Sequence, residues 1–104
     1  MTFGLRESDL DYIIDSIRKH KVIKRATIFG SRAKGSYKPG SDVDIAIFGD
    51  NITLDTLSSL TAKLNDVGPM PYFVDVVDYS RLDQDLMDHI DLVGKDIFLT
   101  GITQ

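Results

Sequence analysis

Three aspartates stand beside or inside runs that otherwise predict β-strands. Asp42 and Asp44 flank the start of an apolar run at residues 43–48, and Asp75 lies within another at residues 72–77. Aspartate is depleted from strands, and a buried carboxylate must be paired, protonated or bound to a cation. Because side chains two residues apart share a strand face, Asp42 and Asp44 are expected to project side by side. If the strand of Asp75 lies alongside, the three predict an oxygen-only site that favours Mg²⁺ or Mn²⁺ over zinc.

A second feature with chemical potential is the pair Gly30-Ser31, which follows a predicted strand at residues 25–29 and opens a short predicted helix. Glycine lets the backbone approach a ligand closely, and a helix N-terminus offers N–H groups and a positive dipole end to a phosphate. Arg32 and Lys34 add positive charge at the same place. An anion site beside a carboxylate-bound metal is the equipment that phosphoryl or nucleotidyl transfer requires.

Structural interpretations of these residues stay open at this point. Asp42 follows a Gly-Ser pair and can be an ordinary turn residue. Asp44 and Asp75 can each be held by a salt bridge, for which Arg32 and Lys34 supply the cations.

Four further side chains are candidates of lower rank. Asp78 is the rival third carboxylate, but its position at the end of the strand and on the opposite face favours Asp75. His20 and His89 are interpreted as surface histidines on helices, since neither has a partner at metal-ligand spacing. Tyr37 is an exposed loop tyrosine that can also stack on a nucleobase.

The elements that position these residues follow from hydrophobic periodicity. Helices are predicted at residues 8–20, at 31–35, from the cap Thr53 to Gly68-Pro69, and at 81–93; strands are predicted at 25–29, 43–48, 72–77 and, as a short edge strand, 96–99. This alternation predicts an α/β (α+β) fold in which helices pack against a small mixed sheet. The length of 104 residues predicts a single domain over residues 1–104.

Composition narrows the classes of function. The chain has no cysteine, which excludes disulfides and cysteine-based metal sites, and it has no apolar run long enough for a signal peptide or a membrane span. A cytoplasmic location is therefore expected. The net charge of -4 argues against stable nucleic-acid binding. Eight of the twelve basic residues nevertheless fall between positions 18 and 38, either as a solvated helix end and loop or as a local positive field for a nucleotide triphosphate.

The spacing of the two motifs resembles a known signature. Gly30-Ser31, followed after ten residues by Asp42-Val43-Asp44, resembles the signature of the DNA polymerase beta-type nucleotidyltransferase superfamily. The whole run GSRAKGSYKPGSDVDIAIFG resembles its smallest branch, the minimal nucleotidyltransferases (MNT), and the resemblance covers about residues 23–79.

The resemblance implies the nucleotidyltransferase fold and a role for each matching residue. Gly30 and Ser31 would bind the triphosphate of ATP, with Arg32 and Lys34 alongside. Asp42 and Asp44 would hold Mg²⁺, with two ions expected. Asp75 would complete the catalytic metal site and help to activate the nucleophile. The family more often has arginine where Lys34 stands, and lysine keeps the charge but lacks the bidentate fork, so the part of Lys34 in phosphate binding stays open.

The resemblance also implies a partner. Minimal nucleotidyltransferases are commonly paired with a helical HEPN protein as antitoxin and toxin, and they move AMP from ATP onto a tyrosine of the HEPN ribonuclease. A chain this short leaves little to grip an acceptor, which agrees with a second protein in a hetero-oligomer. The alternatives are a nucleotidyltransferase subunit for an antibiotic or metabolite, and a non-catalytic module that neutralises its partner by contact. Residues 96–104 are a possible edge for association.

Overall fold

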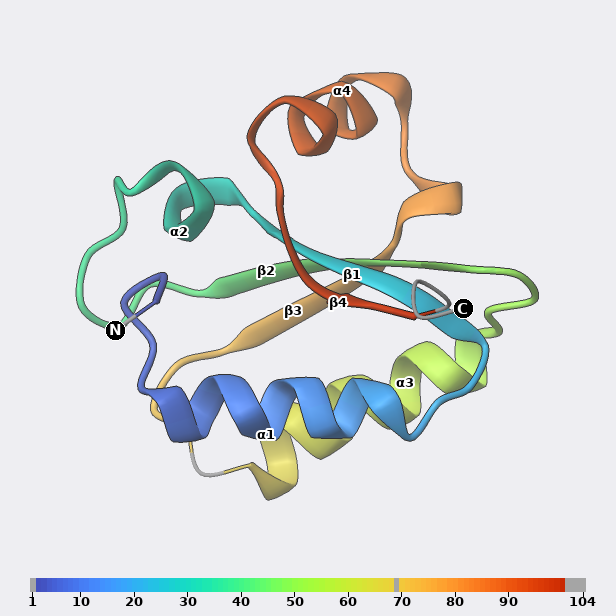
Figure 1. The fold of residues 1–104 in the computed structure, drawn as a ribbon, viewed down its shortest axis with the longest axis horizontal. Helices are drawn as coiled ribbons and strands as arrows, with labels where there is room; N and C mark the ends of the chain where they lie inside the picture. Colours follow the sequence, from blue (N-terminus) through green and yellow to red (C-terminus); the bar gives the residue numbers. More distant parts are fainter. Residues whose placement is uncertain (1, 69, 101–104) are drawn as a thin grey trace.

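Within the described residues, 2–68 and 70–100, the chain folds into a four-stranded mixed sheet with helices on both faces (Figure 1). In chain order the elements are α1 (Glu7–Arg18), β1 (Ile23–Phe29), α2 (Gly30–Lys34), β2 (Val43–Gly49), α3 (Leu54–Ala62), a π-helical turn (Lys63–Val67), β3 (Val74–Asp78), a 3-10 turn (Tyr79–Arg81), α4 (Gln84–Val93) and β4 (Lys95–Leu99). This computed structural model confirms the predicted fold class. It confirms the edge strand at 96–99 as β4. Of the rest of the segment 96–104, residues 101–104 lie outside the described residues.

The strand order is β3-β2-β1-β4, and the pairing explains how distant motifs meet. β1 pairs antiparallel with both β2 and β4, whereas β2 and β3 are parallel and α3 forms the crossover between them. The register sets Asp44 of β2 opposite Phe29 of β1 on one side and opposite Asp75 of β3 on the other. The two aspartates are therefore neighbours across the sheet. The sequence predicts this contact if the two strands are adjacent, and the strand pairing meets that condition.

Helices cover both faces of the sheet, α1 and α3 on one side and α2 and α4 on the other (Figure 1). Val43, Ile45 and Ile47 are fully buried in the larger core, which α1 and α3 cover from one side. Ala46, the residue between two of them, packs in a smaller cluster with Ile90 of α4 on the other side. Because Asp44 alternates with the first set, it lies on the face that α2 and α4 share, and the predicted assignment of faces is confirmed.

The helix after Thr53 ends at Gly68 as predicted, but its last turn is not α-helical. The Thr53 side chain accepts a hydrogen bond from the backbone N–H of Thr56 at 3.1 Å, which confirms it as the cap. The last turn is a π-helix, Lys63–Val67, and it carries Asn65 toward the sheet. The Asn65 amide donates to the carbonyl of Val74 and its oxygen accepts from the N–H of Val74, both at 2.8 Å. The outer edge of β3 is thus closed at Val74 by a side chain of the same protein.

The last helix begins at Gln84 rather than at residue 81. The Asp83 side chain accepts a hydrogen bond from the N–H of Leu86 at 2.9 Å, and such an N-cap fixes the start of a helix. Among the helices that the structure describes, none combines the length and the apolar character needed to cross a membrane.

Candidate active site

Three adjacent strand positions gather the predicted motif residues at one end of the sheet. Asp44 lies between Phe29 on β1 and Asp75 on β3. Gly30 follows Phe29 directly and opens α2 with a left-handed backbone, φ +72°. A Cβ atom on Gly30 would run into the Oδ2 atom of Asp44. The structure therefore brings Gly30, Asp44 and Asp75 into one row, although 45 positions separate the first and last in the sequence.

The exposure of the carboxylates differs from the expectation of burial. Asp44 is half-buried, and Asp42 and Asp75 are exposed. The apolar neighbours of Asp75 suggest burial on both faces, but β3 is an edge strand. Val74 and Val76 are buried on the opposite face, whereas Val77, on the same face as Asp75, is only half-buried against the smaller cluster. The aspartates line a surface that is open to solvent, so burial alone does not force each of them to be neutralised.

The three carboxylates form a local negative field around Asp44. Partial burial raises the pKa of Asp44 above its ordinary value of 3.8, the charges of Asp75 and then Asp42 raise it further, and His89 opposes them. Among the described residues, none of the three aspartates forms an ion pair or a side-chain hydrogen bond. The salt bridges that a structural role for Asp44 and Asp75 requires are absent from this part of the chain, and the field favours a cation.

The donor set fits a hard cation that arrives with a substrate. Within residues 2–68 and 70–100, no group of three or more acidic or histidine side chains gathers closely enough to hold a metal ion alone. Asp44 and Asp75 still present uncompensated oxygens from adjacent strands, with Asp42 two residues away. Mg²⁺ is usually held by one or two carboxylates, with water and substrate phosphates completing its shell. The aspartates therefore fit Mg²⁺ bound together with a nucleotide.

The short helix α2 places Ser31 and Lys34 next to this row. Ser31 is half-buried, and its carbonyl accepts hydrogen bonds from the backbone N–H groups of Gly35 and Ser36, which close the helix. Lys34 is exposed, and no hydrogen bond or ion pair involves its side chain in the part of the chain that the structure describes. Both residues remain available to a ligand.

The expected contact between Arg32 and phosphate is not compatible with the position of its side chain. Arg32 is only 3% exposed, and its guanidinium donates to the carbonyl of Ser41 at 2.7 and 3.1 Å and to the carbonyl of Phe3 at 2.9 Å. Its planar head also lies over the rings of Tyr37 and Tyr72. Arg32 therefore fixes the loop that leads to Asp42.

We expect substitutions of Arg32 and Lys34 to separate stability from nucleotide binding. Arg32→Lys should lower the free energy of unfolding by about 2 kcal/mol, because lysine cannot replace the fork and leaves a partly buried carbonyl unpaired. Lys34→Met should change stability by less than about 0.5 kcal/mol but weaken ATP binding by about tenfold, because a charge beside the phosphates is lost. Urea unfolding and ATP titration of both variants measure the two effects; a Lys34→Met protein that binds ATP normally would remove Lys34 from the site.

The sequence model of the family described as "Polymerase beta, Nucleotidyltransferase" matches residues 11–101, which is most of the chain and includes the row Gly30, Asp44 and Asp75. The chain belongs to the polymerase beta nucleotidyltransferase family. A protein of Methanocaldococcus jannaschii with the provisional name protein adenylyltransferase is 40% identical over 79 residues, 75% of this chain and 82% of the relative.

Solved structures share the fold of this nucleotidyltransferase. A chain in the crystal structure of a toxin–antitoxin with AMP-PNP matches with a TM-score of 0.75 and 25% identity, over 88% of this chain and 73% of that chain. A chain from the complex of the tri-AMPylated Shewanella oneidensis HEPN toxin with its MNT antitoxin has the same fold, with a TM-score of 0.72 and 21% identity over 92% and 74% of the two chains.

His89 of this nucleotidyltransferase lies closer to the row than the sequence interpretation suggests. It is half-buried on α4, its ring meets the ring of Phe29 edge-on at 6.1 Å, and its charge acts on Asp44. The sequence feature that could have predicted this position is spacing. His89 comes three residues after Leu86 and four before Val93, so it belongs to the helix stripe that faces the sheet.

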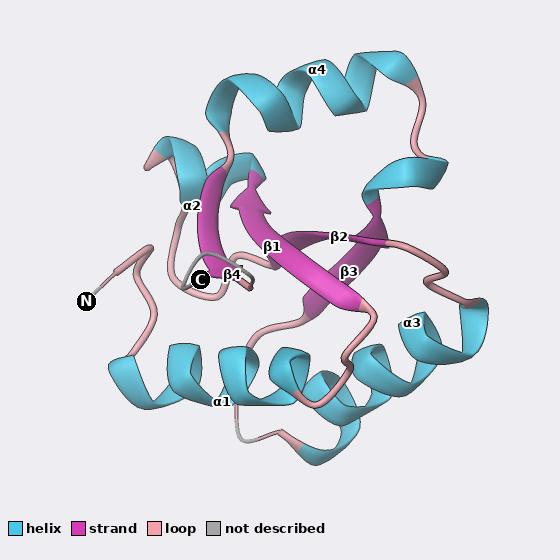
Figure 2. Cartoon of the chain, turned by 45° about the vertical axis from the view of Figure 1, so that its right-hand side comes forward, coloured by secondary structure: helices cyan, strands magenta, loops and turns pink. Residues whose placement is uncertain are grey.

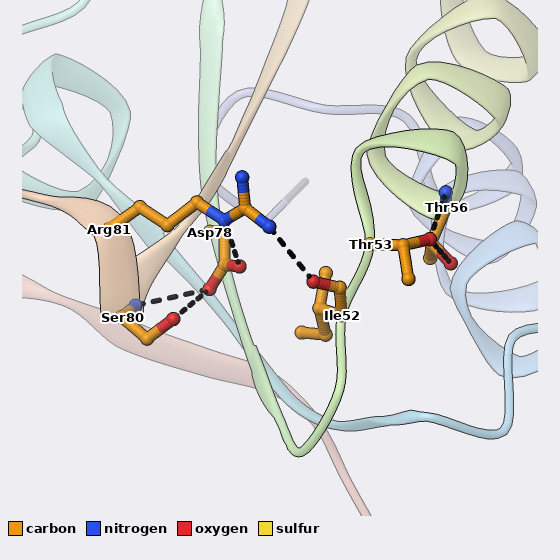
Figure 3. A network of polar contacts seen from close by, with 6 residues as sticks. All are labelled: Ile52, Thr53, Thr56, Asp78, Ser80 and Arg81. Carbon is orange, nitrogen blue, oxygen red and sulfur yellow. Dashed lines mark hydrogen bonds and ion pairs between the residues drawn. The ribbon is translucent and has the colours of Figure 1, made fainter.

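Asp78, the rival third carboxylate, has a structural role (Figure 3). Its side chain is 4% exposed on the face opposite to Asp75. One oxygen accepts hydrogen bonds from the backbone and hydroxyl of Ser80, at 3.1 and 2.9 Å, and the other accepts from Arg81 at 3.2 Å. Arg81 also donates to the carbonyl of Ile52 at 3.3 Å, so Asp78 anchors the turn after β3 to the start of the α3 segment.

Replacing Asp78 by alanine is expected to cost about 2 kcal/mol of folding free energy, because Ser80 and Arg81 lose a buried charged acceptor. The transfer rate per folded molecule should stay within about twofold of the wild type, since Asp78 faces away from the row. Asp75→Ala is the matched variant, with the opposite pattern of low activity and nearly normal stability. Urea unfolding and a nucleotidyl-transfer assay measure both; if Asp78→Ala lost activity while folded and Asp75→Ala did not, the assignment of the two aspartates would be reversed.

Proposed function

We propose that this nucleotidyltransferase moves AMP from ATP onto a tyrosine hydroxyl of a helical HEPN ribonuclease and thereby acts as the antitoxin of a toxin–antitoxin pair. The observation that carries the transfer reaction is the row in which Gly30 adjoins Asp44 and Asp44 adjoins Asp75. The proposal takes residues 1–104 as one minimal nucleotidyltransferase domain, and it places the reaction in the cytoplasm, where ATP and Mg²⁺ are supplied.

The proposed roles follow from position. Asp42 and Asp44 would hold Mg²⁺, with Asp75 completing the set, and two ions are proposed by family resemblance. When bound, Mg²⁺ would neutralise phosphate charge and make the acceptor hydroxyl easier to deprotonate. The missing Cβ of Gly30 lets the Asp44 carboxylate lie directly against the start of α2. There the hydroxyl of Ser31 and the ammonium of Lys34 would contact the oxygens of the triphosphate.

The bond changes of the proposed reaction balance without a further reactant. The acceptor oxygen forms a bond to the α-phosphorus of ATP, and the bond from that phosphorus to the oxygen bridging to the β-phosphate breaks. Pyrophosphate leaves, and the hydroxyl proton passes to the carboxylate of Asp75. Asp75 suits this role because it is exposed on an edge strand, where an incoming hydroxyl can reach it.

A protein acceptor agrees with the openness of the site. Asp42 and Asp75 are exposed, so the surface of an incoming macromolecule would have to exclude water from the reacting groups. The relative named protein adenylyltransferase and the neighbour described as a toxin–antitoxin with AMP-PNP support a protein acceptor and an adenine nucleotide. The tri-AMPylated HEPN toxin is a parallel at the level of the fold.

Intact-mass and peptide mass spectrometry test the acceptor. The chain is incubated with ATP, Mg²⁺ and the product of the neighbouring reading frame, and Asp44→Asn is the control. We expect the partner to gain the mass of AMP on a tyrosine and to lose ribonuclease activity only with the wild-type chain. An unchanged partner mass would contradict the proposal. Neutralisation by Asp44→Asn without modification would show that contact alone is the mechanism, and AMP found on an added aminoglycoside instead would show a small-molecule acceptor.

A further inference from the structure

The two edges of the sheet differ in their availability for another strand. At the β3 edge, the side chain of Asn65 occupies both backbone groups of Val74. β4 (Lys95–Leu99) pairs with β1 on one side, and no described strand lies on its other side. Figure 2 shows β4 at this edge of the sheet, with α1 below it. Backbone groups that point outward from an edge strand are a template for an added strand.

A groove runs beside β4 and has an apolar floor. It is open to solvent and has a volume of about 710 Å³ between the C-terminal half of α1, the turn after α1, the start of β1 and β4. Ile14 of α1 and Ile97 and Phe98 of β4 line it, and Leu99, at the same place, is 46% exposed. An extended peptide paired with β4 could place alternate side chains in such a groove.

The rim of the groove is positively charged in a protein whose net charge is -4. Arg18, Lys21 and Lys24 line it together with His20, and none of the described residues that line it is acidic. Arg18 is partly compensated by an exposed ion pair with Asp15 at 2.8 Å. The ammonium of Lys24 donates to the backbone carbonyl of Lys21 at 3.0 Å, which holds the Lys24 side chain beside the turn after α1. The groove therefore matches a ligand that carries negative charge along an apolar strand.

We propose that this groove docks an extended, acidic polypeptide segment of a partner protein, which adds to the sheet beside β4. A second copy of this chain is disfavoured, because pairing β4 with β4 would bring two positive rims together. Nucleic acid is disfavoured because the groove offers an apolar floor and outward backbone groups, which a peptide strand satisfies and a phosphate backbone does not. The groove is on the α1 side of the sheet and the aspartate row on the α4 side, so the inference is independent of which hydroxyl receives AMP.

NMR titration of the full ¹⁵N-labelled chain tests the inference. The probe is a short peptide in which glutamate alternates with valine, and the matched probe has lysine in place of glutamate. We expect the acidic peptide to shift the amide signals of Lys21, Lys24 and β4, to slow amide exchange in β4, and to bind more weakly as salt is added. The lysine peptide should bind at least about tenfold more weakly.

Charge reversal at the rim is the second part of the test. Lys21→Glu/Lys24→Glu should weaken binding of the acidic peptide by about tenfold. Arg6→Glu/Lys19→Glu, with the same change in charge at exposed residues outside the groove, should bind within about twofold of the wild type. The proposal is overturned if neither peptide shifts β4, if both bind equally, if the rim variant binds like its control, or if a single-stranded oligouridylate occupies the groove at lower concentration than the acidic peptide.

Discussion

Replacing Asp44 by asparagine is expected to lower the rate of AMP transfer by about a thousandfold while leaving the protein folded. Asp44 is the central member of the row, next to Gly30 on one side and Asp75 on the other. An amide of the same shape removes the charge that would hold the cation at the reacting phosphate, and loss of one such electrostatic contact costs roughly 10²–10³ in rate. The larger figure applies here because Asp44 would serve both as a metal ligand and as the residue against which the triphosphate is placed.

The same substitution should raise stability when no divalent cation is present. Burial and the charges of Asp75 and Asp42 raise the pKa of Asp44 above its ordinary value of 3.8. A carboxyl group whose pKa is raised by folding favours the folded state while it is protonated. This stabilisation is lost as the pH rises through the folded pKa and the group ionises. The Tm of Asp44→Asn should therefore match the wild type below pH 3.8 and exceed it at neutral pH in EDTA. Added Mg²⁺ should narrow the difference.

Thermal unfolding at several pH values, with EDTA or Mg²⁺, measures this effect alongside the transfer assay. Asp50→Asn is the matched control, since Asp50 is exposed in the turn after β2 and the change in charge is the same. If the Tm of Asp44→Asn at neutral pH is well below that of the wild type, the charge of Asp44 stabilises the fold. The local negative field around Asp44 would then not mark a cation site.

Replacing Gly30 by alanine is expected to reduce transfer by at least about a hundredfold. The backbone there has φ +72°, which costs an alanine about 1 kcal/mol, and the new Cβ would run into the Oδ2 atom of Asp44. To relieve the clash, either the Asp44 side chain or the start of α2 must move. Displacement of a reacting group by even about 1 Å can cost roughly a hundredfold in rate.

Gly35→Ala separates the two causes. Gly35 ends α2 with φ +83°, but a Cβ there meets nothing within 4 Å. Both variants should lose about 1 kcal/mol of stability from backbone strain, and only Gly30→Ala should also lose most of its activity. Urea unfolding and kcat/KM measure the two effects. Equal activity of the two variants would show that transfer does not depend on the close approach of Asp44 to Gly30.

The parts of the site that follow from local chemistry are predictable from the sequence. Strand alternation is sufficient to put Asp44 on the face opposite to Val43 and Ile45, and the change from an apolar strand to Gly30-Ser31 is sufficient to place the turn. The two motifs also carry the family resemblance that the match over residues 11–101 confirms.

The parts that depend on non-local packing are not predictable in the same way. The exposure of Asp75 depends on β3 being an edge strand, and strand order does not follow from the apolar run around it. The burial of Arg32 depends on carbonyls of Ser41 and Phe3 that converge only after folding. Its position after Gly30-Ser31 suggests a phosphate contact, but the guanidinium satisfies those carbonyls instead.

The most direct test of the central claim, that the row Gly30–Asp44–Asp75 is a nucleotidyltransferase site, is a pair of reactions with ATP labelled at the α- or the γ-phosphate. Each contains Mg²⁺ and the product of the neighbouring reading frame, with Asp44→Asn as the control. We predict α-label on the partner and γ-label in free pyrophosphate, both dependent on Asp44. Transfer of the γ-label to the partner would show phosphoryl transfer instead, and α-label that persists in Asp44→Asn would place the reaction elsewhere in the protein.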